Sequence, residues 1–120
     1  MSTPLSQKYL NVLLSDVSTA GSAYVVAPST GYIKKIYSVI NGAIATANAA
    51  ITTEINGIAV TGGALTITQS GSAAGDVDSA TPTAANFVKA GDVTEVITDG
   101  ASTNTISANF TFVIEETTFF

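Results

Sequence analysis

Turn residues divide most of this chain into short segments rich in β-branched and aromatic residues, and this punctuation constrains the fold more than any other feature. In residues 106–114 every second position is apolar: Ile106, Ala108, Phe110, Phe112 and Ile114. Such alternation is typical of a strand with one face on a core and the other in solvent. Between two further alternating segments, Asn56 and Gly57 favour the tight turn of a hairpin.

About seven or eight such segments follow one another at intervals of roughly 8–12 residues, the spacing found in all-β sandwiches and barrels. At 120 residues the chain is long enough for one domain with a single core. Long loops alternate with hairpins, which favours jelly-roll connectivity. We therefore predict an all-β fold, a single jelly-roll-like β-sandwich of short antiparallel strands with an N-terminal arm.

The first 20 residues differ from the rest of the sequence. Apolar residues here have the spacing of one helix face, although the same stretch can also extend as a strand: Leu10, Leu13, Leu14 and Val17. Residues 15–22 are small and polar, as in a linker. We expect an N-terminal arm or short helix plus linker over residues 1–20, the β-sandwich over 21–116 and a C-terminal tail over 117–120.

Four residue types that carry much of enzyme chemistry are absent: His, Cys, Trp and Arg. Without His or Cys the usual acid–base catalyst and thiol nucleophile are missing, and no disulfide can form. Carboxylate pairs remain at three places: Asp76 and Asp78, Asp92 and Glu95, and Glu115 and Glu116. A glycosidase needs two carboxylates facing each other across a cleft, usually with aromatic platforms. We predict that the chain is not an enzyme and uses no cofactor.

The charge pattern indicates a protein partner. The net charge is −5, and four scattered lysines cannot form the basic stripe that a nucleic-acid binder needs. Charged residues make up 11% of the chain, against about 25% in an average soluble domain, and such a surface is poorly protected against association.

No apolar run approaches the ~20 residues of a membrane span, and the run at 9–14 is short for a signal peptide.

Three local patterns have two interpretations each. Asp76 and Asp78, with Asp99, could offer oxygen ligands to a Ca²⁺ ion, but they have no loop motif of defined spacing, and an ordinary turn is the simpler explanation. The triplet 109–111 (Asn-Phe-Thr) matches a glycosylation acceptor, but it lies inside an expected strand, which favours a chance match. Lys34 and Lys35 indicate an edge strand guarded by charge, or a rim contact to an acidic partner.

Both ends of the chain carry apolar residues outside the expected sandwich. We identify them as candidate partner-binding residues, because large apolar side chains left in water are a liability unless a neighbour covers them. Five lie in the arm and two in the tail: Leu5, Tyr9, Leu10, Leu13 and Leu14, and Phe119 and Phe120. Packing of the arm onto its own domain, and a frayed tail, are the alternatives.

The sequence resembles small structural proteins of tailed bacteriophages, in particular capsid decoration (cement) proteins with a jelly-roll-like β-sandwich. The resemblance covers roughly residues 24–114 and rests on the order of strands and turns. Three stretches carry it: 27–39 (APSTGYIKKIYSV), 51–60 (ITTEINGIAV) and 88–96 (VKAGDVTEV). It implies a homotrimer on the outer surface of the virion, which clamps neighbouring subunits of the major capsid protein at three-fold or quasi-three-fold positions.

We therefore expect a non-enzymatic virion structural protein that stabilises a phage capsid by bridging major capsid subunits. A carbohydrate- or receptor-binding module of a fibre or tail is the first alternative; four tyrosines and long loops permit it, while the missing Trp and Arg weaken it. A subunit of a fibre or pilus-like polymer is the second alternative.

Overall fold

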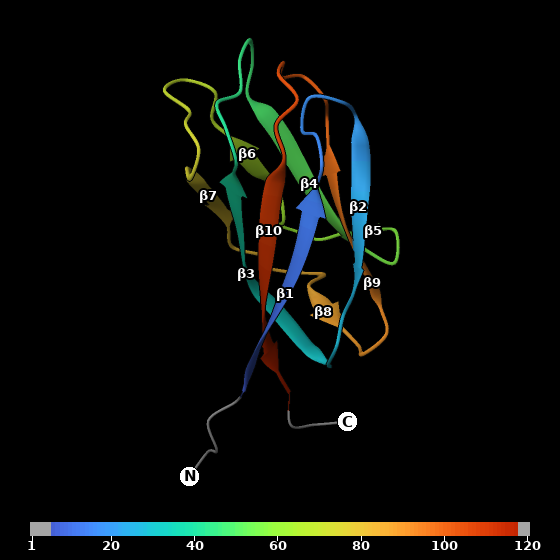
Figure 1. The fold of residues 1–120 in the computed structure, drawn as a ribbon. Coiled ribbons are helices and arrows are strands. Elements are labelled where there is room, and N and C mark those ends of the chain that lie inside the picture. The colour runs from blue at the N-terminus through green and yellow to red at the C-terminus, as the bar shows by residue number, and fades with distance from the viewer. Residues whose placement is uncertain (1–5, 118–120) are drawn as a thin grey trace.

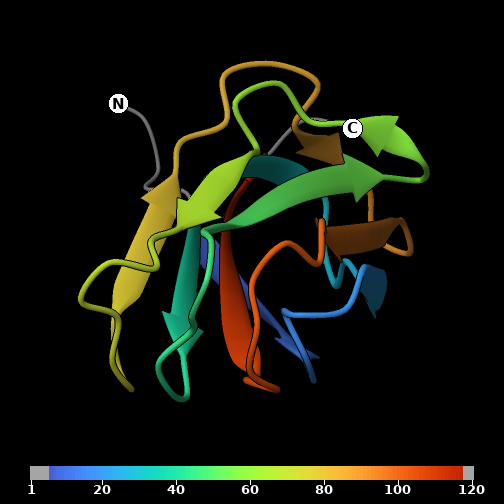
Figure 2. The same cartoon turned by 90° about the horizontal axis from the view of Figure 1, so that it is seen from above.

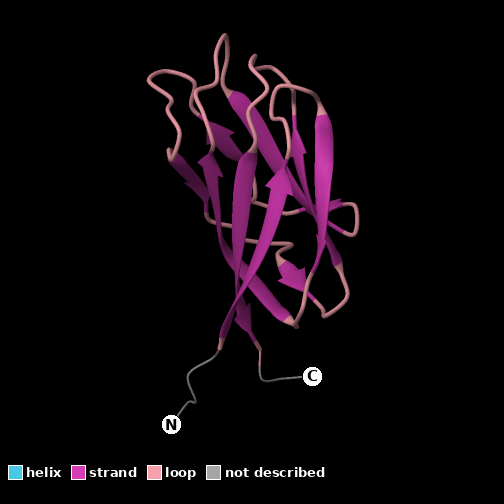
Figure 3. Cartoon of the chain, viewed as in Figure 1, coloured by secondary structure: helices cyan, strands magenta, loops and turns pink. Residues whose placement is uncertain are grey.

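The computed structural model describes residues 6–117 as strands, turns and loops, and this part of the chain contains no helix (Figure 3). The strands form two five-stranded antiparallel sheets, which lie as separate layers when the molecule is viewed from above (Figures 1 and 2). The predicted all-β sandwich is therefore confirmed.

Each sheet has three long strands and two short ones (Figure 1). Sheet A has the order β1-β10-β3-β7, with β8 also on β3; its strands are β1 (Gln7–Leu14), β10 (Ala108–Glu116), β3 (Gly31–Ile40), β7 (Val77–Ala80) and β8 (Phe87–Val88). Sheet B has the order β2-β9-β4-β5, with β6 also on β4; its strands are β2 (Gly21–Val26), β9 (Val93–Thr98), β4 (Ala49–Ile55), β5 (Ile58–Ala59) and β6 (Leu65–Ile67).

The strand order is that of a jelly roll. Long strands alternate between the sheets as the chain proceeds, from β1 in sheet A to β2 in sheet B, then β3 in sheet A and β4 in sheet B. Near the middle of the chain, β5 and β6 share one position beside β4, and β7 and β8 share one position beside β3. Ten strands therefore fill eight positions, four in each sheet, which agrees with the jelly-roll prediction.

The core lies between the sheets and follows the alternation read from the sequence. In β10, Phe110, Phe112 and Ile114 are fully buried, while the residues between them face outward. They pack in one apolar cluster with inward-facing residues of β3 and sheet B, among them Ile33, Ile36, Ile40, Ile51, Ile67 and Val96. Burial of these side chains is the main stabilising contribution in a chain without disulfides.

The expected N-terminal arm is wrong for the residues that the structure describes. Residues 7–14 form β1, which pairs with β10 along its whole length, from Gln7 opposite Glu115 to Leu14 opposite Ala108. They belong to the sandwich and are not joined to it by a linker. The helix-like spacing was misleading, because Leu10 and Leu14 face the core at a period of two while Leu13 faces solvent.

Candidate interaction surface

The outward-facing side chains of sheet A form an ordered array, because the strand registers align them in rows. Three rows follow from the pairing, and a fourth contains Thr81, whose hydroxyl accepts a hydrogen bond from Lys35 Nζ at 2.8 Å. We call this array the outer face of sheet A. Its rows are Leu13–Asn109–Val39–Val77, Asn11–Thr111–Tyr37–Ser79, Tyr9–Val113–Lys35–Thr81 and Gln7–Glu115–Tyr32–Phe87.

This face is apolar and aromatic for an exposed surface. Apart from the tyrosines, Lys35 and Glu115 are the only ionisable side chains in the four rows, and half of the positions in these rows carry apolar or aromatic side chains. Lys34, the residue next to Lys35, is also exposed and lies beside Tyr32. A shallow pocket of about 290 Å³ lies in its first two rows, lined by Tyr37, Ser38, Val39, Val77, Asn109 and Thr111. Contiguous exposed apolar patches mark sites of interaction with proteins or membranes, or ligand-binding grooves.

The two adjacent lysines lie against aromatic rings. The Lys34 Nζ atom is 5.5 Å from the ring centroid of Tyr32, and Lys35 Nζ is 5.9 Å from that of Tyr37. Tyr32 also contacts Phe87 edge to face, with the ring centroids 5.1 Å apart. The two lysines and the rings of Tyr32, Tyr37 and Phe87 therefore lie together on the outer side of sheet A.

The prediction that Lys34 and Lys35 guard an edge strand is wrong, because β3 lies inside sheet A between β10 and β7. The register with β10 shifts between Val113 and Ile114, so that Lys34 is an extra residue in β3. Such a bulge lets two successive side chains reach the surface. Lys34 is exposed and Lys35 half-buried.

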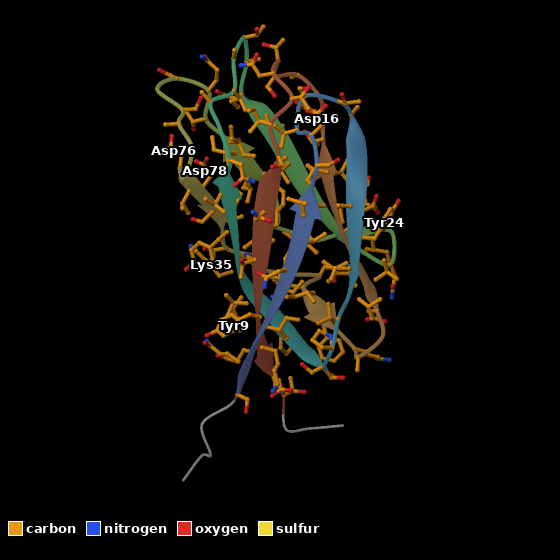
Figure 4. The ribbon with its side chains drawn as sticks, viewed as in Figure 1. Tyr9, Asp16, Tyr24, Lys35, Asp76 and Asp78 are labelled. Carbon is orange, nitrogen blue, oxygen red and sulfur yellow. The ribbon has the colours of Figure 1, made fainter. Side chains whose placement is uncertain are left out.

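The outer face of sheet B has a different chemistry. Glu54 of β4 lies directly opposite Glu95 of β9, and Tyr24 of β2 lies on the other side of Glu95. The strands of sheet B contain no lysine, whereas the four lysines lie in β1 or β3 or directly after β8. Figure 4 shows Tyr9 and Lys35 on one side of the molecule and Tyr24 on the other.

Two aspartates are held within turns. The Asp16 carboxylate accepts hydrogen bonds from the Ser18 hydroxyl at 2.6 Å, the Ser18 amide at 2.9 Å and the Thr19 hydroxyl at 2.9 Å. These bonds, led by the Ser18 hydroxyl, lower the pKa of Asp16 below its ordinary value. The Lys89 backbone amide, 2.8 Å from the Asp92 carboxylate, is the main cause of the lowered pKa of Asp92. Both groups stabilise turns.

The suggested calcium ligands also have backbone partners. Asp76 accepts a hydrogen bond from the Ala73 amide at 2.9 Å, and Asp99 accepts from the amides of Ala50 and Ala101. Asp76 directly precedes β7 and Asp78 lies within it, and both are labelled at that strand in Figure 4. Within residues 6–117 no group of three or more acidic side chains is arranged to hold a metal ion.

The candidate partner-binding residues have three outcomes. Leu10 and Leu14 are only 6% and 5% exposed, so the prediction that they contact a partner is wrong. Because β1 pairs with β10, their side chains point into the core. Tyr9 and Leu13 are 61% and 55% exposed on the outer face of sheet A, and their partner role stays a prediction. Leu5, Phe119 and Phe120 lie outside the described residues.

Sequence reasoning missed most of the outer face of sheet A. Val39, Val113 and Val77 were not singled out, although they are apolar residues at outward positions of their strands. The available signal was that both faces of 32–40 and 110–114 are apolar, which is unusual for a sheet with one face in water.

Comparison with known proteins shows no protein family for the chain. No family model matches it, and no curated protein matches it. It aligns with the crystal structure of the Agl-KA catalytic domain at 13% identity and a TM-score of 0.44, over 95% of this chain and 28% of that chain. It also aligns with exo-beta-1,3-galactanase from Phanerochaete chrysosporium, crystallised with galactose, at 15% identity and a TM-score of 0.42, over 91% of this chain and 27% of that chain.

The chain thus spans less than a third of the length of either structure. At these identities and TM-scores the alignments carry no inference about what the chain does. Separately, the described residues include no helix long and apolar enough to cross a membrane.

Proposed function

We propose that this chain is a non-enzymatic structural protein of a virus particle, which binds a protein shell through the outer face of sheet A. The observation that supports it is the array of four rows, in which Lys35 and Glu115 are the only charged members and Lys34 lies beside Tyr32. Protein interfaces are depleted of charge at their centre and enriched in aromatic residues, and this array has both properties.

The shape of the face supports a broad contact. The outer side of a sheet is open, and the pocket within it is shallow, so a partner would cover the array rather than enter a cavity. Tyr9, Leu13 and Val77 are each more than half exposed at its margins. A partner that covers them removes apolar surface from water, which is the main driving force for such association.

The resemblance to phage decoration proteins gives the proposal its specific form. The shell would be a bacteriophage capsid, the partner its major capsid protein, and the location the outer capsid surface. Each bound copy would contact neighbouring capsid subunits and add interface area that resists internal pressure. This mechanism requires no bond making or breaking.

The carboxylates support a non-enzymatic role. The pocket on the outer face of sheet A is lined by no acidic residue, and a second pocket, lined by Ile55, Asn56, Ile58, Ala85, Phe87 and Asp92, contains one. Hydrolysis of a glycosidic bond by paired carboxylates needs two of them across one cleft. Glu54 and Glu95 are paired, but neither lines one of these pockets.

The test is co-sedimentation with empty shells assembled from the major capsid protein that we expect to be encoded beside this chain. We expect Val77→Glu to weaken binding by at least about tenfold, which corresponds to roughly 1.4 kcal/mol at the interface. The matched control is Ile58→Glu, because Ile58 is 68% exposed and Val77 61% exposed, each on a short strand, but Ile58 lies in sheet B.

Equal binding by the two variants would refute the role of sheet A. A wild-type protein that fails to bind shells but binds a glycan array would favour the carbohydrate-binding alternative. Circular dichroism of each variant shows whether the sandwich is intact.

A further inference from the structure

The two long edges of the sandwich lie on the same side. β1 ends sheet A and β2 ends sheet B, and the two strands are neighbours in Figure 1. On the opposite side the edges are formed by β7, β8, β5 and β6, which have four, two, two and three residues. Short edge strands discourage pairing with another chain, whereas long ones invite it.

The hydrogen-bond pattern shows which backbone groups of β1 face this open edge. The Glu116 amide donates to the Ser6 carbonyl oxygen at 2.9 Å, in continuation of the β1–β10 register. In an antiparallel pair, hydrogen-bonded and non-hydrogen-bonded residues alternate, so the even-numbered residues of β1 bond to β10. The amides and carbonyls of Gln7, Tyr9, Asn11 and Leu13 therefore point away from β10.

The edge carries few of the features that prevent pairing. β1 has a continuous eight-residue register with β10 and no proline. β1 and β2 together contain one charged residue, Lys8. Natural edge strands are usually blunted by charges, prolines or bulges, and β1 has only Lys8 among these features, which leaves a long template for another strand.

We propose that β1 pairs antiparallel with β1 of a second copy of this chain, around a two-fold axis at Asn11. This register uses the free backbone groups of both strands, since it places odd-numbered residues opposite odd-numbered residues. Asn11 lies opposite Asn11 of the second copy, and Tyr9 lies opposite its Leu13. Because the axis is two-fold, each Tyr9–Leu13 contact forms twice.

The side chains favour a second copy over an unrelated strand. Tyr9 and Leu13 are exposed on the same face of β1, and an aromatic residue opposite an aliphatic one is a stabilising cross-strand pair. In the same register Lys8, the only charge of β1, lies opposite Leu14 of the second copy, so no like charges face each other. The strand is thus complementary to itself in its backbone groups and its apolar contacts.

The pairing is independent of the proposed shell binding and differs from the trimer that the phage resemblance implies. It joins the two copies of sheet A into one ten-stranded sheet and makes their outer faces continuous. Sedimentation or light scattering over a wide range of protein concentrations tests it. We expect a species of twice the 12.1 kDa chain mass.

Two variants should raise the dimer dissociation constant by at least about tenfold. Asn11→Pro removes an amide that β10 does not use, so sheet A is kept while the new pairing is blocked. Leu13→Lys places a charge at the edge. Its matched control is Val77→Lys, because Leu13 and Val77 end the same row of the outer face at opposite edges.

Amide hydrogen exchange in the wild-type protein tests the same register without a substitution. The amides of Tyr9, Asn11 and Leu13 should become protected as concentration rises, whereas those of Leu10 and Leu14 should be protected throughout. A monomer at every concentration, a trimer, or a dimer that Val77→Lys dissociates and Leu13→Lys does not, would each overturn the proposal.

Discussion

The two outer faces of the sandwich are built on the same alternation and both carry exposed apolar side chains, but they differ in charge. The outer face of sheet A places tyrosines and valines in register with one another. The outer face of sheet B places Glu54 directly against Glu95, with no lysine in any strand of that sheet. Like charges directly opposite each other are destabilising, and they are tolerated where water screens them.

Under the proposed function, the difference in charge favours sheet A as the face that a partner covers. Sheet B keeps paired carboxylates that would be costly to bury, since an unpaired charge loses its hydration when a partner covers it. Sheet A keeps side chains that gain free energy when covered. Four predictions test this contrast, in order of decreasing expected effect on stability. The first concerns the core face of sheet A and the last concerns the turn between β1 and β2.

The largest effect on the free energy of unfolding is expected on the core face of sheet A. Phe112→Ala should lower the free energy of unfolding by about 3–5 kcal/mol, because Phe112 is fully buried at the centre of β10 and its removal leaves a cavity. Val113→Ala, one residue further and on the outer face, should cost less than about 1 kcal/mol. Urea denaturation measures both. Similar losses would mean that the outer face is as tightly packed as the core.

Glycines at the start of one strand in each sheet give the second prediction. A Cβ atom at Gly31, where β3 begins, would collide with the backbone carbonyl of Glu115, so Gly31→Ala should cost about 1–3 kcal/mol. At Gly21, where β2 begins, the nearest atom to such a Cβ is the Thr19 carbonyl oxygen at 3.7 Å, an ordinary contact.

Gly21→Ala should therefore leave the midpoint of thermal unfolding nearly unchanged. The comparison fails if Gly21→Ala lowers that midpoint as much as Gly31→Ala does.

The carboxylate pair of sheet B gives a smaller effect of opposite sign. Glu54→Lys replaces a like-charge pair by an opposite-charge pair with Glu95 and should raise the free energy of unfolding by about 0.2–1 kcal/mol at low salt. The gain should shrink in high salt, because ions screen exposed charges. Chemical denaturation at two ionic strengths measures it. A gain that does not depend on salt would mean that the effect is not electrostatic.

The all-β sandwich and the core face of β10 were predictable, because these depend on local alternation and turn residues such as Asn56 and Gly57. Jelly-roll connectivity was favoured by the alternation of long loops and hairpins, but the order of the strands depends on pairing between distant segments, which periodicity does not determine. The state of residues 7–14 was not. Their apolar spacing fits a helix and a strand, and only pairing with residues 108–115, about a hundred positions away, selects the strand.

The outer face of sheet A could not be predicted from the sequence for a similar reason. Each of its rows combines residues from four segments of the sequence, and a register shift of one residue would turn every side chain of a strand to the other side. The bulge at Lys34 shifts the register locally, and no residue near it in the sequence indicates its position. Two adjacent lysines were therefore interpreted as the sign of an edge strand, whereas the bulge brings both to the surface of an inner strand.

The smallest effect concerns the turn that leads from sheet A into sheet B. Hydrogen bonds to Ser18 and Thr19 lower the pKa of Asp16 below the ordinary value of 3.8, so the folded state favours the ionised carboxylate. The stabilisation from this group is fully present above pH 3.8 and is lost as the pH falls through the lowered pKa of the folded protein. Asp16→Asn should therefore be less stable than the wild type at neutral pH, and the difference should disappear in strong acid. Urea denaturation of both proteins across this pH range measures the difference, and a constant difference would show that the charge of Asp16 is irrelevant.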